Sequence, residues 1–127
     1  MPQRRRRVDR VVFFPRYTAF VGTTALYTAP LDARAYAEVD LLGWQGTGLG
    51  GTPASVSFTL QHSADLENWV DETAFSPTAG SEAMNNYHLA YAWVRAKAAV
   101  TGADPGVVCW LTGELVYREG PAAGEAP

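Results

Sequence analysis

The feature that most constrains the fold of this chain is a strict alternation of side chains between Tyr91 and Tyr117. Two segments carry it, YAWVRAKAAV and VVCWLTGELVY, and TGADPG joins them. A period of two places successive side chains on opposite faces of a strand, so each segment is predicted to be a half-buried β-strand. Asp104-Pro105-Gly106 has the residue types that favour a turn, and we therefore expect a hairpin.

Burial of one face fixes the register of such a hairpin, because inward residues must face inward residues. The expected pairs are Val100 with Val107, Ala98 with Cys109, Ala96 with Leu111 and Val94 with Gly113. The outer face would then gather Trp93, Arg95, Lys97, Trp110 and Glu114, with Lys97 against the Trp110 ring. Two outward tryptophans indicate an interface, or else a face covered by residues 43–53 or 75–89.

Further strands are predicted where apolar, β-branched and aromatic residues alternate with polar ones between turn residues. They cover residues 23–29, 35–44, 54–62 and 69–74, with a turn at 63–68. The apolar residues 11–14 are predicted to form either an edge strand or an anchor laid on a partner. Residues 75–89 are predicted to be a loop with one possible helical turn at 81–88. Because no helical crossover is found, we expect an all-β fold: an antiparallel β-sandwich or jelly roll of about 7–8 strands with an extended N-terminal arm.

Charge divides the chain into a basic start and an acidic body. Residues 1–16 hold six arginines and one aspartate (+5), the rest holds four basic and twelve acidic residues (−8), and the sum is the net charge of −3. The 127 residues fit one domain. The expected division is a basic arm at 1–16, a sandwich domain at 17–119 and a disordered tail at 120–127.

The arm is predicted to bind a partner. Its expected contact residues are Arg4, Arg5, Arg6, Arg7, Arg10, Phe13 and Phe14. An acidic protein surface, including a neighbouring copy, suits the arginines better than nucleic acid, which the acidic body would repel. The alternative is a solvated tail with no role. Trp93, Arg95 and Trp110 complete the predicted partner-binding set.

Signals of other chemistry are missing from the sequence. No apolar run reaches the roughly 20 residues that span a bilayer, and no secretory leader is expected. The single cysteine, Cys109, excludes an intrachain disulfide and is expected to pack in the core. His62 and His88 have no metal-ligand spacing, and Asp71 and Glu72 point to opposite faces of a strand. We therefore expect no enzyme, no catalytic residues, no metal and no cofactor.

One motif resembles a known group of proteins. VSFTLQHSADLENW (56–69) ends a strand in Ser63-x-Asp65 and places Trp69 four residues later, and YAWVRAKAAVTG carries Trp93-x-Arg95. This resembles small β-sandwich structural proteins from the virions of tailed bacteriophages. The resemblance covers residues 54–118. A similar turn occurs in discoidin-type jelly rolls, which bind sugars or lipids, but those commonly have Asp-Gly where this chain has Asp65-Leu66.

The resemblance implies a non-enzymatic virion protein. It implies in particular a head decoration, or cement, protein that binds the major capsid protein on the capsid surface as a homo-oligomer, with a trimer as one form. Two alternatives stay open. One is a carbohydrate-binding module that stacks sugars on Tyr36, Trp44, Trp93 and Trp110. The other is a component of the tail or the head–tail connector.

Overall fold

Every regular element in the described part of the chain is a β-strand. The structure, a computed structural model, describes residues 7–49, 54–102 and 106–118. Its strands are β1 (Val8–Val21), β2 (Leu26–Tyr27), β3 (Leu31–Asp32), β4 (Tyr36–Gly48), β5 (Ala54–Ser63), β6 (Val70–Asp71), β7 (Ser81–His88), β8 (Trp93–Gly102) and β9 (Gly106–Tyr117). These residues form no helix long and apolar enough to cross a membrane.

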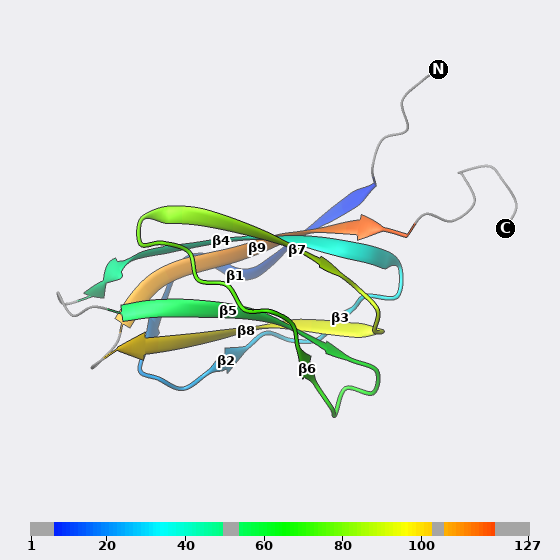
Figure 1. Cartoon of the computed structure of the whole chain (residues 1–127), viewed down its shortest axis with the longest axis horizontal. Helices are drawn as coiled ribbons and strands as arrows, with labels where there is room; N and C mark the ends of the chain where they lie inside the picture. The colour runs from blue at the N-terminus through cyan, green and yellow to red at the C-terminus, as the bar shows by residue number, and fades with distance from the viewer. Residues whose placement is uncertain (1–6, 50–53, 103–105, 119–127) are drawn as a thin grey trace, which may run out of the picture.

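The strands form two antiparallel sheets that pack face to face (Figure 1). The first sheet has the order β1-β9-β4-β7, and the second has β2-β8-β5-β6 with β3 also paired to β8. The predicted all-β antiparallel sandwich is confirmed. The described residues contain nine strands rather than seven or eight, because three of them are two-residue pairings at the margins of the second sheet.

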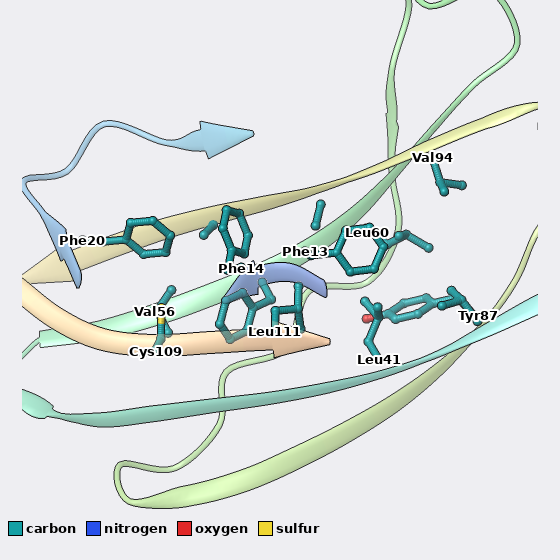
Figure 2. Packing of buried hydrophobic residues seen from close by; sticks show 14 of the residues in the cluster. Phe13, Phe14, Phe20, Leu41, Val56, Leu60, Tyr87, Val94, Cys109 and Leu111 are labelled. Atoms are coloured by element: carbon teal, nitrogen blue, oxygen red, sulfur yellow. The ribbon is translucent and has the colours of Figure 1, made fainter. Parts of the chain in front are cut away.

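The core lies between the two inner faces, as Figure 2 shows. The predicted alternation holds: Val94, Ala96, Ala98 and Val100 are buried on β8, and Val107, Cys109, Leu111 and Leu115 are buried on β9. Phe58 and Leu60 of β5 and Val39 and Leu41 of β4 fill the same layer with no exposed surface. Removal of this apolar area from water is the main stabilising contribution to such a fold.

The predicted hairpin between β8 and β9 is wrong. β8 pairs with β5, where Ala98 lies beside Phe58, whereas β9 pairs with β1 and β4 in the other sheet. None of the expected pairs forms, because the two strands lie on opposite sides of the core. Two strands that each bury every second side chain can be neighbours in one sheet or can lie in two facing sheets. The alternation is the same in both arrangements, so it could not decide between them.

The predicted arm boundary also changes, because β1 is an edge strand of the first sheet from Val8 onward. Val12 pairs with Thr112 and Phe14 with Leu111, so one extra residue is inserted at Phe13. Such a bulge lets consecutive residues face the same side, and Phe13 and Phe14 are both buried in the core. Gly113 makes room for Phe13, since a Cβ there would lie 3.0 Å from Cε2 of this ring.

The segment predicted as a loop at 75–89 contains a full strand. β7 pairs with β4 from Ser81 to His88 without interruption, so the possible helical turn at 81–88 is wrong. Asn85 and Asn86 disfavour a strand by composition. Their pairing with Leu41 and Asp40 in the sheet overrides that local preference.

Candidate interaction surfaces

The sandwich splits the predicted partner-binding face in two. Trp93, Arg95 and Lys97 lie on the outer face of the second sheet, and Trp110 and Glu114 lie on the outer face of the first. The core separates these two groups, so the expected contact of Lys97 with Trp110 does not exist. Each outer face is therefore a separate candidate surface.

Arg95 is the centre of the surface on the second sheet. Its guanidinium carbon lies 4.1 Å from the ring centroid of Trp69 and 4.4 Å from that of Tyr27. Its Nε donates to Oε1 of Gln61 at 2.7 Å, and Gln61 in turn donates to Asp71 at 2.6 Å. We call Tyr27, Trp69, Arg95 and Lys97 the Arg95 stack. Cation–π contacts and a fixed hydrogen bond hold this guanidinium in one position.

The turn between β5 and β6 places Trp69 on Arg95. Oδ1 of Asp65 accepts hydrogen bonds from the backbone N–H groups of Glu67 at 2.9 Å and Asn68 at 2.8 Å. Oγ of Ser63 accepts from the N–H of Leu66 at 2.8 Å. The backbone N–H of Asn68 is the main cause that holds the pKa of Asp65 well below its usual range. The motif Ser63-x-Asp65-x-x-x-Trp69 is thus explained as turn chemistry that positions one aromatic ring.

The outer face of the first sheet carries an apolar row. Register places Val12, Thr112, Leu42 and Met84 side by side across all four strands. Val12 and Met84 at the two ends are 60% and 64% exposed. We call this row, with Trp44 and Trp110 beside it, the Trp44 face. Exposed apolar area of this kind is typical of a contact surface.

A shallow hollow lies at one end of the Trp44 face. Arg16, Tyr17, Trp44, Glu82 and Trp110 line it. Trp44 pairs with Trp110 across β4 and β9, and the guanidinium of Arg16 lies 4.5 Å from the Trp110 ring centroid. Trp110 is buried with 5% exposure, whereas Tyr17 is 85% exposed and has a φ of 65°. An exposed aromatic side chain on a left-handed backbone is uncommon, so the hollow is part of the candidate contact surface.

A polar cluster closes the end of the sandwich where β1 begins. The hydroxyls of Tyr36 and Tyr117 both donate to Oδ2 of Asp9, and the guanidinium of Arg7 lies 4.4 Å from the Tyr117 ring centroid. The hydrogen bond from Tyr117, followed by that from Tyr36, lowers the pKa of Asp9. This cluster fixes the first residues of β1 to β4 and β9.

Metal-ligating side chains do not gather in the described part of the chain, and two titratable side chains lie in its interior. No set of three or more His, Cys, Asp or Glu side chains converges within the described ranges. Burial raises the pKa of Cys109 to about 12, which disfavours the reactive thiolate. His62 is fully buried, and Oε1 of Glu72 lies 3.0 Å from its Nε2 outside hydrogen-bonding geometry. Burial lowers the pKa of His62 and outweighs the opposing charge of Glu72.

The predicted partner-binding residues have different locations. Arg4, Arg5 and Arg6 lie outside the described residues. Arg7 and Arg10 are exposed on the edge of the first sheet, and Phe13 and Phe14 lie in the core rather than on a surface. Val12, Met84 and Tyr27 are outside the partner-binding set predicted from the sequence, and the sequence predicted Trp69 only as part of its turn motif and not as a contact residue. The alternation of 35–44 places Leu42 and Trp44 outward, but nothing local shows that Val12 and Met84 lie in the same row.

Comparison with known proteins identifies the fold but not a family. No protein-family model matches the sequence, and no curated protein matches it. The PBSX exported protein XepA has a TM-score of 0.68 at 12% identity, over 90% of this chain and 39% of that one. A structure of infectious bursal disease virus, Gx strain, has a TM-score of 0.55 at 10% identity, over 92% of this chain and 33% of that one. This chain therefore spans well under two thirds of either neighbour, and the likeness is one of fold.

Proposed function

We propose that this protein is a non-enzymatic structural component of a phage virion and acts as a head decoration protein on the capsid surface. The Trp44 face carries this proposal. Its apolar row ends in two exposed side chains, Val12 and Met84, and these offer apolar contact area to a partner. The fold is shared with a PBSX protein and with a virus structure, which supports a virion setting.

The Trp44 face has the composition of a protein contact. Trp, Met and Arg are enriched at protein interfaces. Along the strands, the row with Leu42 and Met84 lies between Trp44 on one side and the charged pair Arg10 and Glu114 on the other. Glu114 lies 4.0 Å from Arg10, and both side chains are largely exposed. In this proposal the apolar row contacts the major capsid protein, and the charged pair forms the polar rim.

The basic start of the chain contributes a second contact in this proposal. Arg10 lies on β1 at the edge of the first sheet, Arg7 directly precedes this strand, and Arg4, Arg5 and Arg6 come earlier in the sequence. An acidic surface of the shell would attract this charge, and salt would weaken the attraction. Deletion of residues 1–6 should therefore lower particle binding more at low salt than at high salt.

The test is co-purification with particles from the organism that encodes the chain. Particles are induced, heads and tails are separated on a density gradient, and the protein is detected with an antibody. A decoration protein should sediment with the heads. Met84→Lys and Val12→Lys should each abolish this binding to heads, whereas the matched variant Ser57→Lys on the second sheet should remain bound. Detection only in the unsedimented fraction would overturn a virion role, and detection with tails alone would replace decoration by the tail or connector alternative.

The carbohydrate-binding alternative lacks its expected platform. Tyr36 lies in the cluster with Asp9, Trp93 lies on the second sheet, and Trp44 and Trp110 lie on the first. The four rings therefore occupy three separate places and cannot stack on one glycan. Glycan-array binding that is lost on Trp44→Ala would nevertheless favour this alternative over decoration.

A further inference from the structure

The edge of the first sheet formed by β7 has no strand partner in the part of the chain that the structure describes. β7 pairs with β4 and is the last strand of its sheet. Five of its eight residues are exposed, among them Glu82, Met84, Asn86 and His88. An open strand edge presents unpaired N–H and C=O groups to any strand that can align with it.

The ladder shows which backbone groups are free. The N–H of Leu89 donates to the C=O of Ala37 at 2.9 Å, one position beyond the last β4–β7 pair. Hydrogen-bonded and non-bonded pairs alternate along an antiparallel ladder. Tyr87, Asn85 and Ala83 therefore bond β4. The N–H and C=O groups of the even-numbered residues 82–88 point to the open edge.

The other edges are protected. β1 contains Pro15, which has no N–H, and two register shifts that interrupt its regular spacing. The margins of the second sheet are two-residue strands. Beyond β6, the edge of β5 is closed by Phe75, which exchanges two backbone hydrogen bonds with Phe58, and by Gln45, whose Oε1 accepts from the N–H of Val56. β7 is thus the longest regular open edge among the described strands.

We propose that β7 pairs with β7 of a second copy of this chain in an antiparallel, two-fold arrangement. Register with Asn85 opposite Asn85 sets Glu82 opposite His88 of the second copy, and Met84 opposite its Asn86. Glu82, Met84, Asn86 and His88 carry the free backbone groups, and their side chains lie on the same face of the sheet. Side chains that lie opposite each other in such a ladder interact. The Glu82–His88 contact occurs twice, and no like charges are opposed.

The outer face makes the same arrangement favourable. Met84 is 64% exposed at the end of the apolar row. In this register it lies diagonal to Met84 of the second copy, so the two rows meet at the seam. The two four-stranded sheets then form one continuous sheet with the order β1-β9-β4-β7-β7-β4-β9-β1. The pairing does not depend on the virion role, and it makes the repeating unit a dimer rather than the trimer that the resemblance implies.

Amide hydrogen exchange tests the pairing residue by residue. At low protein concentration the N–H groups of Glu82, Met84, Asn86 and His88 should exchange rapidly, and those of Ala83, Asn85 and Tyr87 should be protected. At high concentration the four even-numbered amides should become protected too, while sedimentation gives the mass of two chains. Rapid exchange of these amides at every concentration, or a trimer in sedimentation, would overturn the proposal.

Two sets of variants separate edge pairing from other contacts. Met84→Pro removes one edge N–H that β4 does not use and should abolish the dimer, whereas Met84→Ala keeps that N–H and should retain it. Glu82→Lys should weaken the dimer, because the carboxylate that faces His88 is lost. Glu82→Lys with His88→Glu should restore the dimer, because side chains of opposite charge then face each other. Val12→Lys, at the far end of the same row, should leave the dimer intact. Loss of the dimer in Val12→Lys would show face-to-face stacking and contradict edge pairing, whatever the outcome of the particle test.

Discussion

At the scale of single residues, His62 is the group whose environment departs furthest from its residue type. It is the last residue but one of β5 and has no exposed surface, and neither ring nitrogen has a hydrogen-bond partner in the described structure. The Glu72 carboxylate and the edge of the Tyr91 ring are its nearest polar and aromatic neighbours. Burial of a neutral imidazole disfavours its protonation.

This burial predicts a pH-dependent stability. Because the native pKa of His62 is lowered, the unfolded chain binds the proton first as the pH falls below about 6.5. The free energy of unfolding should therefore fall between pH 7.5 and 5.5, by at most about 1.4 kcal/mol per pH unit from this group. Urea unfolding at both pH values measures it.

The substitution that tests this is His62→Gln, which should flatten the pH dependence. The carboxylates act at lower pH. Hydrogen bonds and charge from Arg34 lower the pKa of Asp32 to about 2, so its stabilisation is lost only as the pH falls below about 4–5. An unchanged slope in His62→Gln would contradict the assignment to His62.

At the scale of elements, Gln45 joins strands that belong to different sheets. It lies on the inner side of β4 with 2% exposure, accepts from the N–H of Val56 on β5 at 3.0 Å and donates to the C=O of Pro77. Period-two alternation would place an apolar residue there. The glutamine is used because β5 has no strand partner at Val56 on the side away from β8, and a buried backbone N–H requires an acceptor.

Gln45→Met should therefore destabilise the protein by about 2–5 kcal/mol, because two buried backbone groups lose their partners. The control is Leu42→Met, the same new side chain on the outer side of the same strand, with a cost of about 1 kcal/mol or less. Urea unfolding of the two variants measures the difference. Equal losses would mean that the hydrogen bonds of Gln45 contribute nothing to the stability of the fold.

At the scale of the whole molecule, β1 is part of the sandwich rather than an appendage. Phe14 packs edge-to-face on Phe20 at 5.1 Å between ring centroids and stacks near Phe58 of the other sheet at 6.3 Å. Truncation of a buried aromatic residue typically costs about 3–5 kcal/mol. Phe14→Ala should destabilise the domain by that amount.

Val12→Ala is the matched control, two residues earlier in the same strand and 60% exposed. It should change stability by less than about 0.5 kcal/mol. Thermal and urea unfolding compare the two. A small loss in Phe14→Ala would restore the description of this segment as an arm with a partner-binding role.

Much of this protein was determined by the sequence alone. Alternation in 35–44, 54–62 and 91–117 predicted which side chains face the core, and it held at Val39, Leu60, Val94 and Cys109. The turn at Ser63–Asn68 was predicted from Asp and Asn side chains, and Asp65 makes the expected bonds to the backbone. These are local properties: a backbone of period two and a side chain that bonds its own turn.

The tertiary structure decided which strands are neighbours. β8 and β9 follow each other in the chain and share one inward pattern, yet they lie in different sheets. The same pattern fits neighbouring strands of one sheet and strands of two facing sheets, because the sequence shows that a side chain is buried but not which strand buries it. The bulge at Phe13 and the row from Val12 to Met84 depend on pairing between distant segments. The interaction surfaces, unlike the core, therefore follow from the assembled sheets and not from any one stretch of sequence.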